Sequence, residues 1–246
     1  MADVLVLCYH AVSDRWPAAL SVTPDALEEQ LGLLVERGYQ GATFESVVSS
    51  PPSAKTVVVT FDDGFASVIE RAAPILRRLG LPGSLYVVTD HPASPERPMA
   101  WEGTDRWLGT EHEDELRPMS WDQVGELAGE GWEIGSHTAS HPRLSKVADD
   151  GELGRQLEES RGVLEERLGR PCRSLAYPYG DHDDRVVAAA GRAGYEAACT
   201  LPGRFNRPEP LRWPRVGIYH EDDRRRFRLK ASRAMRMLRT TPLWPR

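Results

Sequence analysis

The sequence predicts an α/β protein in which a parallel sheet is covered by helices, built either as a barrel or as an open sheet. Short apolar runs alternate with amphipathic segments along the chain, and this alternation is typical of strands joined by helical crossovers. The length of 246 residues fits one barrel-sized domain. A composition of 40% hydrophobic and 28% charged residues is ordinary for a globular protein and excludes wholesale disorder.

The first third of the chain begins with two strands and a helix between them. Residues 4–7 form a short apolar strand. A helix is expected to start at Thr23, because a proline follows this capping residue at the first helical position, and to end near Gly38. Residues 56–61 are β-branched and aromatic, which predicts a buried strand.

A helix, a strand and a long loop follow. The helix covers about residues 66–79 and ends at Gly80, and the strand covers 84–88. Residues 89–118 are rich in Pro, Asp, Glu and Gly and are predicted to form a long loop. Long loops of this kind in compact domains are often functional, so we expect a lid or a wall of the substrate site.

The rest of the chain continues the alternation. Ser120-Trp121-Asp122-Gln123 is a capping box and predicts a helix that begins there. Further strands are expected at residues 132–135, 175–177, 196–200 and 213–218, and further helices at residues 152–168 and 183–193.

Several features of the sequence indicate in which cellular compartment the protein is expected. No apolar run reaches the roughly 18 residues of a membrane span. The apolar N-terminal run is too short for a signal peptide and carries Asp3 where basic residues are expected. The three cysteines are widely spaced and form no CxxC pair, which indicates a reducing compartment and no cysteine metal site. We therefore expect a cytoplasmic protein.

Charge separates a tail, residues 222–246, from the body, residues 1–221. The net charge of −6 argues against nucleic-acid binding, but nine basic residues and no acid lie from Arg224 to Arg246, and residues 1–223 carry a net charge of −15. The tail has apolar residues at helical spacing: Phe227, Ala231, Ala234, Met235 and Leu238.

Two interpretations of this basic amphipathic tail remain open. The apolar stripe can pack on the body while the arginines pair with its acids, which is the interpretation that we favour. Alternatively, the tail can lie on an anionic membrane, at its inner face, with Trp244 as an interfacial anchor, and bring the site to a lipid-linked sugar.

Polar clusters follow four of the predicted strands: His10, Asp62-Asp63-Gly64, His137 and Pro178-Tyr179-Gly180. In a barrel these positions share the rim at the carboxyl ends of the strands, where catalytic groups gather. The adjacent carboxylates of Asp62 and Asp63 repel each other unless a cation is near, although Asp63-Gly64 is also a common turn.

His137 and His141 supply the remaining ligands of a possible metal site. They are four residues apart, so one helical turn would place both imidazoles on one side, a suitable geometry for zinc or a similar divalent ion. Two surface histidines in a loop are the alternative. One carboxylate and two histidines form a three-ligand site with an open position, as in catalytic metal sites.

The third cluster offers a backbone donor. Pro178 fixes the chain at the strand exit and Gly180 permits a sharp turn, so the N–H of Tyr179 can point into the site and stabilise an oxyanion. An ordinary proline turn is the alternative.

Taken in order, TFDDG, SHTASH and YPYG resemble the first three motifs of the polysaccharide deacetylase (NodB-homology, carbohydrate esterase family 4) superfamily. The N-terminal YHAV is similar to the branch that deacetylates poly-N-acetylglucosamine. The resemblance covers roughly residues 3–220 and implies a distorted (β/α)7 barrel over residues 1–221. It also implies that Asp63, His137 and His141 bind one divalent metal ion, for which zinc is expected. Asp62 would then be the general base, and the turn at Pro178 and Tyr179 would hold the oxyanion.

Two family features are missing. The family often has an arginine two residues before the motif-three proline, to orient the catalytic aspartate, but Ala176 stands there. Arg215 is the replacement that we expect, with pairing to a surface acid as the alternative. The later Leu-His motif that supplies the general acid has no clear match; His10 is the first candidate and His220 the second, whereas His182 is expected to be a solvated loop residue.

The resemblance implies a metal-dependent N-deacetylase that hydrolyses the acetamide of an N-acetylated sugar. Without an export signal, we expect a glycan or glycoconjugate precursor such as a glycolipid or nucleotide-sugar intermediate. A metal-dependent hydrolase of a cyclic or linear non-sugar amide is the second hypothesis. A non-catalytic glycan-binding relative is the third, and the complete set of metal and base residues argues against it.

Overall fold

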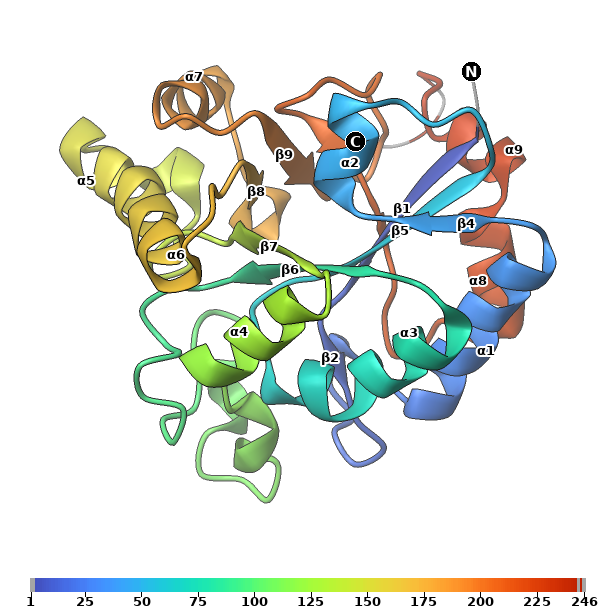
Figure 1. Cartoon of the computed structure of the whole chain (residues 1–246), viewed down its shortest axis with the longest axis horizontal. Coiled ribbons are helices and arrows are strands. Elements are labelled where there is room, and N and C mark those ends of the chain that lie inside the picture. The colour runs from blue at the N-terminus through green and yellow to red at the C-terminus, as the bar shows by residue number, and fades with distance from the viewer. Residues whose placement is uncertain (1–2, 243, 245–246) are drawn as a thin grey trace.

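The centre of the molecule is a parallel sheet that rolls almost into a closed barrel (Figure 1). The computed structural model describes residues 3–242 and 244. Along the sheet the strands follow the order β10-β9-β8-β7-β6-β5-β1-β11. Their bounds are β1 (Val4–Tyr9), β5 (Thr56–Phe61), β6 (Gly83–Val87), β7 (Glu133–Ser136), β8 (Ser174–Ala176), β9 (Ala197–Thr200), β10 (Trp213–Pro214) and β11 (Val216–Gly217).

One segment of chain closes the barrel. β10 pairs with β9, with Trp213 opposite Cys199, while β11 pairs with β1, with Val216 opposite Leu7. Arg215, the single residue between β10 and β11, is wholly buried. Because β10 and β11 are consecutive parts of one segment, the barrel has seven strand positions, and the predicted (β/α)7 fold is confirmed. Joining β9 to β1 in this way leaves less open sheet edge, where backbone groups would otherwise be unpaired.

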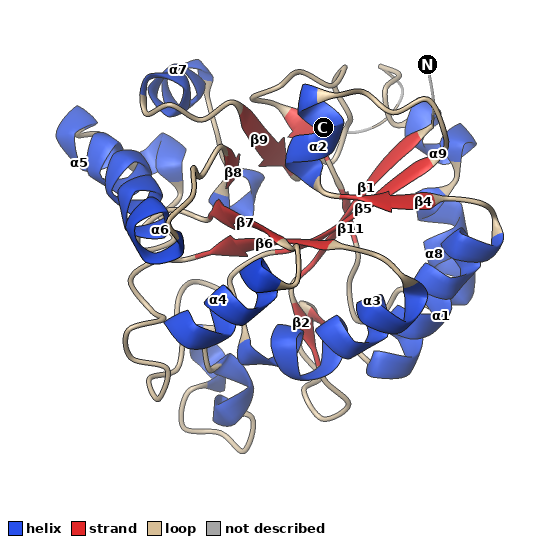
Figure 2. Ribbon diagram, in the orientation of Figure 1, coloured by secondary structure: helices blue, strands red, loops and turns tan. Residues whose placement is uncertain are grey.

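Helices surround the sheet and cover its outer face (Figure 2). They are α1 (Pro24–Glu36), α2 (Phe44–Ser49), α3 (Ala73–Leu79), α4 (Trp121–Gly129), α5 (Asp150–Gly154), α6 (Ser160–Leu168), α7 (Asp184–Arg192), α8 (Arg224–Ala231) and α9 (Arg233–Leu238). The predicted caps are present: Thr23 accepts from the amide of Ala26, and Ser120 and Gln123 make both bonds of the capping box.

Short elements escaped the sequence analysis. These are β2 (Ala11–Val12), β3 (Ser21–Val22), β4 (Gln40–Ala42) and α2. Runs of two to six residues carry too little periodicity to be recognised. Two predicted helices also contain π-helical turns, at Val68–Ala72 before α3 and at Arg155–Glu159 between α5 and α6.

The segment 89–118 is anchored by its own apolar cluster. It forms short 3₁₀ turns at Asp105–Trp107 and Glu113–Leu116. Met99 and Leu116 are buried against Trp16 and Phe65 of the barrel side. This long connection is therefore held in place rather than left as a free flap.

The tail packs on the barrel through its first helix. α8 lies beside α1, and Phe227 and Ala231 are buried in the main core (Figure 1). Three ion pairs tie the tail to acids of the body: Arg224–Glu29, Arg226–Glu221 and Arg236–Asp3.

The apolar residues at helical spacing in the tail do not lie on one continuous helix. The backbone of Ser232 is extended and separates α8 from α9, where Ser232 caps the second helix. This break turns Ala234 and Leu238 outward, so the predicted apolar stripe does not continue beyond Ala231 as a buried face. Within the part of the chain that the structure describes, no helix is long and apolar enough to cross a membrane.

Phe227→Ala tests the packing of the tail. Phe227 is fully buried, so we expect the free energy of unfolding to fall by about 3–5 kcal/mol. Leu229→Ala is the matched control, because Leu229 is 56% exposed on the same helix and its loss is expected to change stability by less than about 0.5 kcal/mol. Urea unfolding measures both. Equal midpoints for the two variants would show that α8 does not share the core.

Candidate active site

Side chains from the ends of several strands meet at one rim of the barrel. Asp62 and Asp63 follow β5, His137 follows β7, and His10 follows β1. All four are buried. Since the strands are parallel, their carboxyl ends lie at the same end of the barrel, which is where the sequence predicts the site.

Three ligand-type atoms converge in this rim. The Nε2 atoms of His137 and His141 each lie 3.3 Å from Oδ1 of Asp63. The Nδ1–H of His137 donates to the carbonyl of Ala176 at 2.7 Å. A carbonyl can only accept, so Nδ1 of His137 carries a proton, and Nε2 is the nitrogen that faces Asp63 and is placed to bind a metal ion.

The two histidines converge by a route that differs from the predicted helical turn. Residues 137–141 form a bent loop in which Thr138 and His141 have φ values of 69° and 64°. The amide of Thr138 donates to Ser136 Oγ, and the amide of His141 donates to Thr138 Oγ1, both at 3.0 Å. Hydrogen bonds to hydroxyls, rather than helix geometry, therefore bring the imidazoles together.

Left-handed backbone is concentrated in this rim. In the described residues the non-glycine positions with positive φ are Asp63, Thr138, His141 and Tyr179. Such conformations cost of order 1–3 kcal/mol each and persist where the surrounding structure holds them. The site is therefore rigidly preorganised by the barrel around it.

The donor set fits a divalent cation. Asp63 Oδ1 is buried and has no hydrogen-bond partner among the described residues, although two imidazole nitrogens lie beside it. Burial works against ionisation, but the neighbouring His137 and His141 hold the pKa of Asp63 far below its usual range. One carboxylate and two imidazoles, buried and with ligand atoms within 4.8 Å of one another, are ligands that zinc and similar ions accept.

Asp62 is held by a buried arginine rather than by this cluster. Arg215 donates from both terminal nitrogens to the two carboxylate oxygens of Asp62, each at 2.7 Å, and also to Thr60 Oγ1 at 2.9 Å. Burial raises the pKa of the carboxyl, but the Arg215 guanidinium outweighs this and lowers the pKa of Asp62 to about 2. Ala176, two residues before Pro178, has no side chain that could orient Asp62, but its carbonyl accepts a hydrogen bond from His137.

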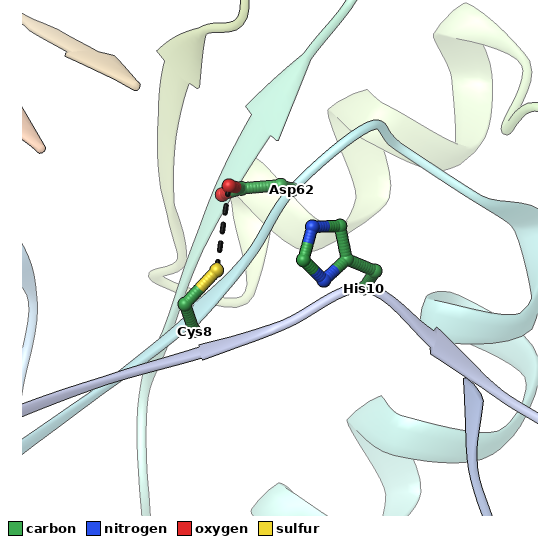
Figure 3. Close-up of side chains that lie close together, drawn as sticks. All are labelled: Cys8, His10 and Asp62. Carbon is green, nitrogen blue, oxygen red and sulfur yellow. Dashed lines mark hydrogen bonds between the residues drawn. The ribbon is translucent and has the colours of Figure 1, made fainter. Parts of the chain in front are cut away.

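Cys8 and His10 complete the surroundings of Asp62 (Figure 3). The Cys8 thiol donates to Asp62 Oδ2 at 3.4 Å, and the three side chains form a second group of potential ligands. Burial raises the pKa of Cys8 well above its ordinary value, so the thiol stays protonated. A cation there would have to displace the guanidinium of Arg215 from Asp62.

His10 lies beside the two aspartates, whereas the other candidate acids do not make such contacts. Burial lowers the pKa of His10, with Asp63 and Asp62 acting in the opposite sense. Its Nδ1 has no partner among the described residues. His220 instead hydrogen-bonds through its ring to the carbonyl of Ser21, and His182 hydrogen-bonds to Gly180 and stacks on Tyr177.

The turn after β8 has the expected shape. Tyr179 has a φ of 59°, and a Cβ on Gly180 would lie 2.7 Å from the amide of Leu201, so glycine is required there. The Tyr179 ring lies 4.7 Å from that of His141, and the guanidinium of Arg143 lies over it at 4.0 Å.

Trp101 is a site residue that the sequence analysis missed. Its indole stacks on the imidazole of His141, with 4.2 Å between ring centroids and an angle of 27°. Glu102 next to it pairs with Arg143 at 2.9 Å. The segment 89–118 thus forms a wall of the site, as expected, and the presence of large aromatics in an otherwise polar loop was the available signal.

The sequence from residue 49 to residue 198 matches the family described as polysaccharide deacetylase. The chain belongs to the polysaccharide deacetylase family. The chemistry of this family is hydrolysis of N-acetyl amide bonds, and the chain is a hydrolase of this class.

Relatives of this polysaccharide deacetylase family member cover most of its length. A poly-beta-1,6-N-acetyl-D-glucosamine N-deacetylase of Staphylococcus epidermidis is 23% identical over 215 residues, which is 82% of this chain and 69% of that protein. The structure of a polysaccharide deacetylase from Bacillus cereus has 28% identity and a TM-score of 0.74 over 93% of this chain and 69% of its own. A Streptococcus pyogenes deacetylase in complex with acetate has 22% identity and a TM-score of 0.75, over 94% and 99%.

Arg215→Met tests the buried ion pair of this deacetylase. Removing one partner leaves the other charge uncompensated, so we expect unfolding to become easier by about 3–5 kcal/mol at pH 7. The pKa of Asp62 in the folded protein, about 2, lies below its ordinary value of 3.8. The stability that the pair contributes is therefore present above pH 4 and lost as the pH falls towards 2.

Urea unfolding at pH 7 and at pH 3 measures this effect. The deficit of Arg215→Met is expected to shrink at pH 3, and the double variant Arg215→Met/Asp62→Asn is expected to recover part of the loss at pH 7. A deficit of the same size at both pH values would show that the guanidinium stabilises the fold by packing and not by its charge.

Proposed function

We propose that this protein is a metal-dependent N-deacetylase that hydrolyses the acetamide of an N-acetylated sugar in a glycan or glycoconjugate precursor. The observation that carries the proposal is that two adjacent carboxylates have different partners. Asp63 faces two imidazoles, whereas the adjacent Asp62 is clamped by Arg215. The relative in Staphylococcus epidermidis, a poly-beta-1,6-N-acetyl-D-glucosamine N-deacetylase, supports the sugar as the substrate class.

Asp63, His137 and His141 would hold the metal ion, for which zinc is the expected identity. When bound, such an ion supplies Lewis-acid polarisation of the acetamide carbonyl. The stack of Trp101 on His141 and the hydrogen bond from His137 to the Ala176 carbonyl fix the orientation of both rings. The chain therefore presents these ligands without the need to reorganise them on binding.

Asp62 acts as the general base and Arg215 positions it. The guanidinium keeps the carboxylate ionised at any working pH and holds it in one orientation, so that it accepts a proton from the attacking water. The N–H of Tyr179 supplies a donor to the developing oxyanion.

His10 protonates the departing amine, because an amide anion is too poor a leaving group. Its place beside Asp62 and Asp63 supports this role, and the ring contacts of His220 and His182 with backbone carbonyls elsewhere favour His10 over them.

Acetate release from a panel of N-acetylated sugars and non-sugar amides, combined with metal analysis, tests the proposal. His137→Ala is expected to lose both bound metal and turnover. Asp62→Asn is expected to retain the metal and lose turnover by about 10²–10⁴-fold, the usual contribution of general-base catalysis. Full metal occupancy in His137→Ala would overturn the ligand assignment. Turnover of non-sugar amides alone would change the substrate class.

His10→Ala tests the assignment of the acid, with His220→Ala as the matched control. We expect His10→Ala to slow amide hydrolysis far more than hydrolysis of activated esters, whose leaving groups need no proton. The alkaline limb of the pH–rate profile should flatten, and this limb should lie at low pH because burial lowers the pKa of His10. If His220→Ala shows this pattern instead, the roles of the two histidines are reversed.

A further inference from the structure

An apolar cavity lies at the opposite end of the barrel from the aspartates. It has a volume of about 460 Å³, within the usual range of small-ligand sites. Its wall includes Val4, at the start of β1, whereas His10 follows the end of that strand. Six residues of extended chain span about 20 Å, which is the approximate distance between the two ends of β1. The cavity is therefore separate from the candidate active site.

The inner wall of this cavity is apolar and comes from four parts of the chain. The barrel, the end of α2, the last strand segment and α9 all contribute. The residues on which the argument rests are Val4, Val6, Val47, Trp213, Val216 and Met237. Val47 and Val216 are fully buried around it, whereas Met237 is 60% exposed at its edge. An apolar lining of this size accepts a hydrocarbon chain.

The mouth of the cavity is basic. Arg207, Arg233 and Arg236 line it together with one acid, Asp3. Arg236 is already engaged, because it donates to Asp3 at 2.6 Å and to the carbonyl of Val4 at 2.9 Å. Arg207 and Arg233 are exposed and form no ion pair among the described residues. Two guanidinium groups at the edge of an apolar cavity match a ligand with one hydrocarbon chain and an anionic head.

We propose that this cavity binds one hydrocarbon chain of an anionic amphiphile, with the chain against Val47 and Trp213 and the head group, a phosphate or carboxylate, at Arg207 and Arg233. Guanidinium groups pair well with both kinds of anion. The chain can come from a free amphiphile or from a lipid of an anionic membrane. Met237, 60% exposed on α9, lines the cavity and would contact either source.

Dodecyl phosphate at concentrations below micelle formation is the probe, and isothermal titration calorimetry with the full chain is the measurement. We expect saturable binding at one site per chain. Inorganic phosphate and dodecanol, the head and the chain alone, are expected to bind much more weakly. Met237→Asp should abolish binding because it places a carboxylate at the mouth, whereas Leu229→Asp, a change of the same charge on an exposed residue away from the cavity, should leave it unchanged.

The arginines have a matched control of their own. Arg233→Ala should weaken binding about tenfold, as expected for the loss of a charged hydrogen-bond partner, whereas Arg228→Ala removes the same charge from an exposed tail position outside the cavity and should have no effect. All four variants change exposed residues, so unfolding midpoints and acetate release should stay as in the parent protein. Equal binding by Met237→Asp and Leu229→Asp, or no saturable binding, would overturn the proposal.

Sedimentation with phosphatidylglycerol vesicles identifies the source of the chain. If the cavity takes its ligand from a bilayer, Met237→Asp should lose vesicle binding that Leu229→Asp retains. If dodecyl phosphate binds but vesicles do not, the cavity serves a free amphiphile. Vesicle binding that is equal in both variants, together with no binding of dodecyl phosphate, would assign membrane contact to the basic tail surface and remove the cavity site.

Discussion

The buried pair of Arg215 and Asp62 joins the closure of the barrel to the candidate chemistry. Arg215 lies between β10, which pairs with β9, and β11, which pairs with β1. Its guanidinium donates to both carboxylate oxygens of Asp62. Burying two charges is costly, and their attraction offsets this only with good geometry and further hydrogen bonds, which Thr60 and Cys8 supply. If the last segment shifted along the sheet, the base would lose its orientation and the core would hold an unpaired charge.

At the rim of the barrel, the adjacent carboxylates of Asp62 and Asp63 have different surroundings. Asp62 is neutralised by a fixed positive charge inside the protein, whereas Asp63 turns through a left-handed backbone position towards two imidazoles. The unfavourable conformations at Asp63, Thr138, His141 and Tyr179 are held by hydroxyl hydrogen bonds, a required glycine and the stack of Trp101. Their cost of order 1–3 kcal/mol each is offset by the rest of the fold, and the result is a preorganised site.

The two ends of the barrel have different chemistry. One end gathers carboxylates and histidines from the strand exits, and the other holds an apolar cavity with a basic mouth, completed by α9. The tail contributes to this arrangement in two ways. Phe227 and Ala231 of α8 enter the core, and the break at Ser232 turns α9 so that Met237 borders the cavity while Leu238 faces outward. The basic charge of the tail thus partly pairs with acids of the body and partly remains at the surface.

The sequence alone determined the features that depend on local chemistry and on strand order. Alternating patterns, caps such as Ser120 with Gln123, and polar residues after strands predicted a parallel sheet with Asp62, Asp63 and His137 at one edge. The resemblance of the motifs to a known family implied that this sheet is a barrel. Arg215 was a candidate partner of Asp62 only because the family arginine is replaced by Ala176; tertiary structure decided the contact, since 153 residues separate the two partners. The left-handed loop that joins His137 to His141, the stack of Trp101 and the far cavity were likewise decided by packing. Such features depend on contacts between residues distant in sequence, and no local periodicity or propensity encodes them.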